Sequence, residues 1–445
     1  MASRLGRAAF ARLRHRRVAF GAGVSACGIG LGLHHFQDNF ATESSGRVQT
    51  TSFNPQQGVF RVDTIVVPSN YPCEDKMSSI SIPNPAWSFW SIYDGHVGPQ
   101  TSTLLERTLI PTLVESLWDV YAKAKIPEPA AIHEVFRTVC LEMDDAIVNK
   151  PVALVQNLPE GAHRMTIAAS VLQEARAGSC ALIAFYEAAL RRIHVAVVGD
   201  SRAILGRRRR TTDGTLVYDV HVLSLDQNTK NPAEVARLVA AHPDEPKLMD
   251  QEKGRLLGWG LTRAFGDGVM KWSRELQTWM EKEVLGDRPR ATTLTPPYFT
   301  AEPEVTTTDV QPGDFLIMGS DGLWECLTNE EAVGLVGAWV ARWGKGSIVP
   351  GQNFGSEEKV ERNSLPVGIT DDKTNYWRWD NIKKVFTNID SGNVAGHLVR
   401  NALGGANRDL YEALLATGAP RSRHIRDDIS VIVVFFDEDK SMSDS

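Results

Sequence analysis

Residues 87–96 read WSFWSIYDGH and combine a strand pattern with an abrupt polar end. Aromatic and β-branched side chains interspersed with serine run up to Tyr93, a pattern typical of a β-strand. Asp94, Gly95 and His96 follow directly, which places a carboxylate and an imidazole at the rim of the predicted sheet. An Asp-Gly pair after a single strand is usually only a turn, so this stretch needs support from elsewhere in the chain.

Four further acidic clusters supply that support. VAVVGDS (195–201) and FLIMGSDG (315–322) repeat the pattern of an apolar run that ends in aspartate. Carboxylates gathered at one rim repel one another unless cations lie between them. Carboxylate and carbonyl oxygens suit Mg²⁺ and Mn²⁺ better than zinc or copper. The sequence therefore predicts a metal centre built from Glu74-Asp75, Asp94-Gly95-His96, Asp200-Ser201, Asp321-Gly322 and Asp427-Asp428.

The remaining pattern predicts an α+β fold. Strand candidates beyond 87–93 lie at 181–186, 193–198, 216–223, 315–319 and 429–436, and helical patterns lie at 99–124, 128–149, 231–241, 328–341 and 391–416. Strands that come in hairpins and helices that come in pairs favour antiparallel sheets flanked by helices over a doubly wound sheet. Because the last strand carries a motif that belongs with residues near 94, we expect one domain over 60–437, with insertions near 206–260 and 344–385.

The N-terminal segment has the composition of a mitochondrial presequence. Residues 1–37 hold six arginines and no acidic residue, and the first acid is Asp38. The apolar run 18–33 is slightly short for a membrane helix, so two interpretations stay open. It is either the end of a cleaved presequence within 1–40 or an inner-membrane anchor that leaves the protein in the intermembrane space instead of the matrix. A polar linker at 41–59 and an acidic tail at 438–445 complete the predicted organisation.

Bulk composition excludes several other classes of protein. The net charge of −6 gives no support for a nucleic-acid partner. The five cysteines are scattered and form no Cys-x-x-Cys pair, which argues against a disulfide framework and against a thiolate zinc site.

Several of these motifs resemble those of the metal-dependent protein phosphatases of type 2C, the PPM family. The resemblance extends over roughly 60–437 and is closest to the pyruvate dehydrogenase phosphatase branch, through RLLGWGLTRAFGDGVMKW (255–272) and TPPYFTAEPEVT (295–306). It implies a central β-sandwich of two antiparallel sheets with helices outside. The matching motifs are CEDK (73–76), YDGHVG (93–98), VVGDSRAILG (197–206), TRAFGD (262–267), GSDGLWECLT (319–328) and RDDISVIVV (426–434).

The resemblance also implies a role for each candidate residue. Asp94 would bridge two Mg²⁺ or Mn²⁺ ions, the Gly95 carbonyl would ligate one of them, and His96 would act as general acid. A hydroxide that bridges the ions would attack phosphoserine in line. The implied substrate is the alpha subunit of pyruvate dehydrogenase; the alternatives are another mitochondrial phosphoprotein or an inactive scaffold. The other implied ligands are Asp321 and Asp427, with Glu74 and Asp75 bound directly or through water. Asp200 would lie nearby, where it either holds a third, weaker ion or caps the backbone N–H groups of a tight turn.

Departures from the family pattern carry their own expectations. Asn70 stands where many members have an arginine that grips the substrate phosphate, so we expect compensation from another group such as Lys76. Asp428 stands where many members have asparagine, and its extra charge would either tighten metal binding or face solvent. Asp267 is expected to order the flap or a turn and not to bind metal, and Arg202 and Arg263 are expected to form ion pairs.

Overall fold

The computed structural model describes residues 48–54, 57–250, 252–343, 358–368, 379, 382–388 and 392–437. The predicted presequence, its apolar run 18–33, the acidic tail and much of the predicted insertion at 344–385 lie outside this part of the chain. Among the described residues, no helix combines the length and the apolar character that crossing a membrane requires.

One layer of the molecule is a six-stranded antiparallel sheet in the order β1-β2-β18-β15-β9-β10. In its centre, Ile432 of β18 lies opposite both Thr64 of β2 and Met318 of β15. The strands are β1 (Val48–Asn54), β2 (Val59–Val67), β18 (Ile429–Phe436), β15 (Phe315–Gly319), β9 (Arg202–Arg210) and β10 (Leu216–Val222).

This sheet corrects two boundaries predicted from the sequence. The second half of the linker predicted at 41–59 is strand β1, which pairs with β2 from Val48 opposite Val66 onward. Its polar composition concealed the strand, but Thr50 suits a pleated surface and its hydroxyl lies 2.8 Å from that of Thr64. Residues 206–210, predicted to open an insertion, likewise continue β9 in register with β10.

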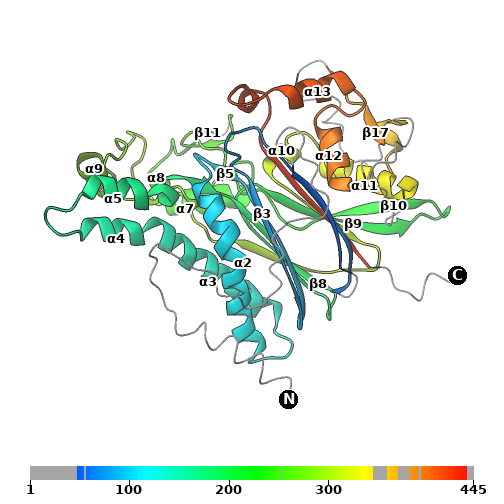
Figure 1. Ribbon diagram of the computed structural model, residues 1–445, viewed down its shortest axis with the longest axis horizontal. Coiled ribbons are helices and arrows are strands. Elements are labelled where there is room, and N and C mark those ends of the chain that lie inside the picture. Colours follow the sequence, from blue (N-terminus) through cyan, green and yellow to red (C-terminus); the bar gives the residue numbers. More distant parts are fainter. Residues whose placement is uncertain are drawn as a thin grey trace.

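A five-stranded antiparallel sheet in the order β14-β8-β7-β4-β3 packs against the first. The described structure therefore confirms the predicted α+β sandwich, which Figure 1 shows with helices on both outer faces. Sequence reasoning missed the two edge strands, β3 and β14, because serine, threonine and charged side chains interrupt the apolar pattern in both. The strands are β14 (Glu304–Asp309), β8 (Arg192–Val198), β7 (Ala181–Glu187), β4 (Ala86–Tyr93) and β3 (Lys76–Pro83).

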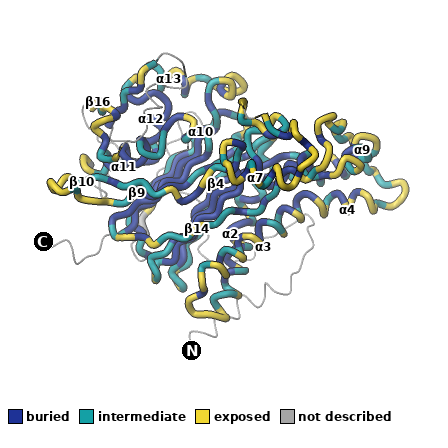
Figure 2. Tube along the Cα trace, turned by 180° about the vertical axis from the view of Figure 1, so that it is seen from behind, coloured by how far each residue is buried: buried dark blue, intermediate teal, exposed yellow. Residues whose placement is uncertain are grey.

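Three buried apolar layers hold the sandwich together. Between the sheets, Trp90 and Leu182 of one sheet share a cluster with Ile432 of the other. Outside the five-stranded sheet, α2 (Gln100–Tyr121) and α3 (Pro129–Val148) cover Phe185. Outside the six-stranded sheet, α11 (Asn329–Trp343) and α12 (Val394–Ala402) cover Phe435. Figure 2 shows the strands buried and the outer helices with one exposed side.

The helix predicted over 391–416 is two helices, α12 and α13 (Arg408–Ala416). Gly405 between them has φ +55°, a left-handed conformation that ends helices and that glycine adopts at little cost. A side chain at this position would also collide with the Val385 carbonyl oxygen, because an added Cβ would lie 2.3 Å from it. Chain reversal at this glycine therefore divides one periodic pattern into two helices.

Short elements gather at one end of the sandwich. A three-stranded sheet, β13-β6-β5, links residues from three distant segments, and a small subdomain with its own core around Leu238, Leu256 and Tyr298 lies beside it. The small sheet consists of β5 (Gly95–His96), β6 (Gly178–Ser179) and β13 (Phe265–Gly266), and the subdomain contains α7 (Pro232–Ala241), β11 (Met249–Asp250), β12 (Arg255–Leu256) and α8 (Gly268–Lys271). The remaining elements of the described chain are α4 (Lys150–Gln156), α5 (Arg164–Val171), α6 (Gln173–Arg176), α9 (Arg274–Glu283), α10 (Asp321–Trp324), β16 (Glu358–Val360), β17 (Phe386–Asn388) and the 3-10 turns η2 (Arg362–Ser364) and η3 (Arg421–His424).

Candidate metal centre

Strand direction brings the predicted acidic clusters to one end of the sandwich. Asp94 and Asp200 follow the ends of β4 and β8, which run parallel with β7 between them. Asp321 follows the end of β15, and Asp427 precedes the start of its antiparallel neighbour β18. The two sheets meet where the Asp321 amide donates to Asp94 Oδ2 at 3.4 Å. Residues more than 200 positions apart thus share one rim.

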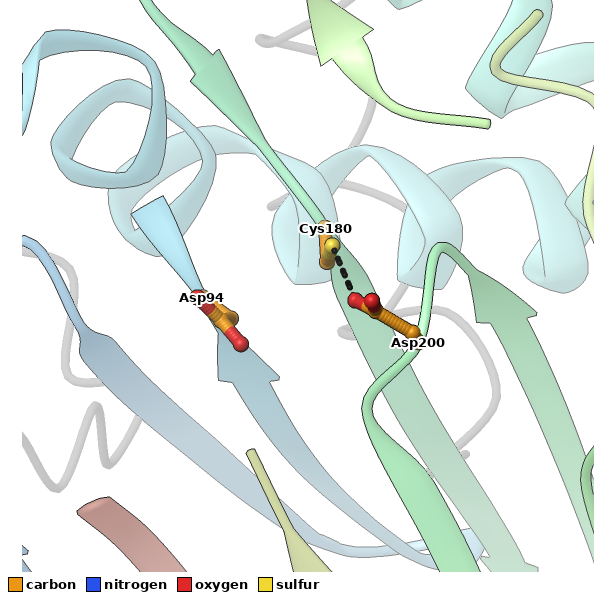
Figure 3. Close-up of side chains that lie close together, drawn as sticks. All are labelled: Asp94, Cys180 and Asp200. Atoms are coloured by element: carbon orange, nitrogen blue, oxygen red, sulfur yellow. Dashed lines mark hydrogen bonds between the residues drawn. The ribbon is translucent and has the colours of Figure 1, made fainter. Parts of the chain in front are cut away.

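A cysteine that sequence reasoning did not single out for this site lies among these carboxylates. Ligand atoms of Asp94, Cys180 and Asp200 all lie within 4.8 Å of one another (Figure 3). The Cys180 thiol donates to Asp200 Oδ1 at 3.3 Å, and burial raises the pKa of the thiol, with Asp200 and Asp94 adding to the effect. Cys180 is therefore a neutral hydrogen-bond donor that orients Asp200. The sequence feature that could have identified Cys180 as a site residue is its position directly before strand β7.

Crowding makes the carboxylates hard to ionise without cations. Burial raises the pKa values of Asp94 and Asp321 well above the ordinary range, and neighbouring carboxylates raise them further. Burial, followed by the charge of Asp428, raises the pKa of Asp75 to about 8, and Asp75 Oδ2 has no hydrogen-bond partner in the described structure. Buried and crowded carboxylate oxygens, one of them without a hydrogen-bond partner, are the kind of ligands that Mg²⁺ and Mn²⁺ prefer.

Glu74 and Gly95 are locked together by close backbone contact. A Cβ on Gly95 would lie 2.4 Å from the Glu74 carbonyl oxygen, so only glycine lets the two segments approach this closely. The Glu74 carboxylate accepts from the Gly98 amide and from Asn70 Nδ2, both at 2.5 Å. Asn70 thus holds a candidate ligand in place instead of facing an incoming phosphate.

Asp428 takes neither of the roles expected of it. Its side chain is 3% exposed and accepts hydrogen bonds from the backbone amides of Ser69, Asn70 at 3.0 Å and Glu74 at 2.9 Å. Burial acts to raise the pKa of Asp428, but these backbone donors outweigh it and lower the pKa. The extra carboxylate therefore fixes the loop that carries Glu74 and Asp75.

His96 is paired with a carboxylate from a distant segment. Its Nε2 lies 2.6 Å from Oδ2 of Asp267, which is fully buried and has a left-handed φ of +47°. Burial lowers the pKa of His96, but Asp267 raises it by charge and hydrogen bonding, and the net direction is upward. Asp267, expected only to order a turn, therefore also orients the candidate general acid.

Three basic residues near the rim differ in what they can do. Lys76 Nζ donates to the backbone carbonyls of Cys73 at 2.8 Å and Asp75 at 3.3 Å, so its contacts give no support for a phosphate-binding role. Arg423, which sequence reasoning missed, forms an ion pair with Asp427 Oδ2. Arg202 pairs with Asp226 at 2.6 Å, as expected of it.

Comparison with known proteins agrees with this geometry. Residues 69–360 match the family model of Protein phosphatase 2C. A protein phosphatase 2C homolog of Schizosaccharomyces pombe is 38% identical over 86% of this chain and 82% of its own length. The mitochondrial pyruvate dehydrogenase phosphatase 1 of Saccharomyces cerevisiae is 32% identical over 88% of this chain and 71% of its own length. The human protein of the same name is 27% identical over 89% of this chain and 81% of its own length.

The chain therefore belongs to the protein phosphatase 2C family, whose members depend on Mg²⁺ or Mn²⁺. It is a protein-serine/threonine phosphatase, and pyruvate dehydrogenase phosphatases are among its relatives.

Proposed function

We propose that this phosphatase hydrolyses phosphoserine on the alpha subunit of pyruvate dehydrogenase in mitochondria. The observation that carries the chemistry is the convergence of buried carboxylates with raised pKa values at one rim. The substrate and location are supported by the identity to mitochondrial pyruvate dehydrogenase phosphatases over most of both chains. The arginine-rich, acid-free segment 1–37 also favours mitochondrial import.

The residues fit two divalent ions. Asp94, Asp321, Asp427 and the Gly95 carbonyl would hold them, with Glu74 and Asp75 directly or through water. Asp200, with the Cys180 thiol beside it, would hold a third, weaker ion. The bound ions would offset the charge of the phosphate and lower the pKa of a nucleophilic water.

The chain's own residues supply the proton for the leaving group. A serine alkoxide is a poor leaving group, so it needs a proton as the ester bond breaks. Asp267 holds Nε2 of His96, which leaves Nδ1 to carry the proton that is delivered. The upward pKa shift of His96 keeps a larger share of the imidazole protonated at neutral pH.

Phosphate release from a panel of phosphoserine peptides tests the substrate. The panel holds the dehydrogenase alpha-subunit peptide, its scrambled sequence and unrelated phosphopeptides of equal charge, each assayed with full-length protein and Mn²⁺. We expect the highest kcat/KM on the alpha-subunit peptide, because surface contacts around the site select the substrate. Equal turnover on the scrambled peptide would leave the phosphatase and remove the proposed substrate. Absence of turnover on every peptide would favour the scaffold alternative.

A further inference from the structure

The candidate centre gathers carboxylates from five distant segments of the chain. Six carboxylates border it, from Glu74, Asp75, Asp94, Asp200, Asp321 and Asp427. If all six ionise, two charges remain unbalanced when two divalent ions are bound. A phosphate monoester brings further negative charge into this field and needs cationic donors at the entrance.

Two basic side chains near the rim do not supply such a donor. Arg426 is 5% exposed and gives its hydrogen bonds to the backbone carbonyls of Leu414 at 3.2 Å and Pro68 at 2.7 Å. Lys76 is similarly bound to carbonyl oxygens of its own loop. Both are therefore committed to structure within the part of the chain described here.

Arg423 differs from these two residues. It lies on η3, its side chain is 46% exposed, and its Nη1 donates to Asp427 Oδ2. This contact places the guanidinium directly beside one of the candidate metal ligands, with part of its surface open to solvent. Within the described residues, no hydrogen bond engages its Nε or Nη2.

We propose that the guanidinium of Arg423 binds the phosphate group of the substrate at the mouth of the metal centre. The planar fork of arginine matches two phosphate oxygens, and its pairing with Asp427 holds that fork in place before substrate arrives. Asp427 Oδ1 already accepts from the Asp428 amide at 2.8 Å, so the carboxylate is an oriented anchor. Arg423 thereby supplies the cation that Asn70 and Lys76 do not. This inference rests on the proposed function of the same site.

Two substitutions and one matched control test it on full-length protein. The variants are Arg423→Ala and Arg423→Lys, and the control is Arg421→Ala, which removes an exposed arginine from the same turn. Three quantities are measured: KM and kcat for a phosphoserine peptide, the Kd of inorganic phosphate for the Mg²⁺-loaded protein by calorimetry, and the Kd of Mg²⁺ itself. Thermal unfolding checks that each variant is folded.

Loss of a charge-assisted contact predicts that Arg423→Ala raises both KM and the phosphate Kd about tenfold. Arg423→Lys recovers part of that loss, and Arg421→Ala behaves as wild type, with the Mg²⁺ Kd unchanged throughout. Wild-type phosphate affinity in Arg423→Ala overturns the proposal, and a weakened Mg²⁺ Kd with normal phosphate binding assigns Arg423 to positioning Asp427 instead. Because calorimetry needs no turnover, a protein that cleaves no phosphopeptide refutes the proposed function separately from the phosphate contact.

Discussion

Gly178 is the position where a single added methyl group would separate His96 from its carboxylate partner. It pairs with His96 on one side and with Gly266 on the other, in the centre of the β13-β6-β5 sheet. A Cβ at residue 178 would lie 2.1 Å from His96 Nε2 and 2.3 Å from Asp267 Oδ2. Van der Waals contact needs about 3.5 Å, so in Gly178→Ala the imidazole or the carboxylate must retreat by more than about 1 Å.

A displacement of about 1 Å at a catalytic group costs on the order of a hundredfold in rate. We therefore expect kcat of Gly178→Ala for a phosphoserine peptide to fall about 100-fold, within the range of a lost general acid. With p-nitrophenyl phosphate the leaving group departs without a proton, so its kcat should stay close to wild type. Asp267→Asn, which adds no volume, should show the same difference between the two substrates.

The assay compares kcat for both substrates at saturating Mn²⁺, together with the thermal midpoint of each variant. Gly418→Ala is the control, because a Cβ there meets no atom within 4 Å. A wild-type kcat on the phosphopeptide in folded Gly178→Ala would refute the role of the His96–Asp267 pair. Equal loss on both substrates would show that the methyl group disturbs the metal centre instead.

Two other predictions concern pH. Burial acts to raise the pKa of Glu234, but hydrogen bonds from Arg263 and Arg237 lower it to about 2. A lowered folded-state pKa stabilises the protein at pH values above the ordinary pKa of the group. The free energy of unfolding in urea should therefore be about 3 kcal/mol larger for wild type than for Glu234→Gln at neutral pH, and this difference should shrink below pH 4.5. A difference that stays constant with pH would contradict this. The raised pKa values of Asp94 and Asp321 mean that protons compete with metal for these carboxylates. The rise in thermal midpoint from chelator-treated to Mn²⁺-loaded protein should therefore be larger at pH 8 than at pH 6. An equal rise at both pH values would contradict this.

Local sequence patterns were enough to predict antiparallel sheets flanked by helices and to identify the candidate carboxylates, and the family resemblance added the β-sandwich. Apolar runs that end in aspartate give both the strand and its polar rim, as in 315–322 around β15. Antiparallel pairing then decides which strand ends meet, as for β15 and β18. Polar strands such as β1 escaped the same reasoning because their stability comes from pairing with β2 and not from an apolar pattern.

The partners of the site residues could not be predicted in this way. Asp267 reaches His96 across 171 positions, and its left-handed backbone has no periodic signature. Asp428 was visible as an extra charge, but only the fold shows that it binds the backbone around Glu74. Arg423 lies in a short 3-10 turn, where sequence alone does not tell which side chain faces the metal centre. Such contacts depend on tertiary packing and leave no local pattern.

Phosphate release from a phosphoserine peptide, measured against Mn²⁺ concentration for wild type and Asp94→Asn, tests the central claim most directly. The claim is that the carboxylate rim around Asp94 is a metal centre that hydrolyses phosphoserine. It predicts that wild-type turnover saturates with Mn²⁺ and stops with chelator, and that folded Asp94→Asn stays inactive at every Mn²⁺ concentration. Turnover that survives chelation, or that is equal in Asp94→Asn, would contradict the claim.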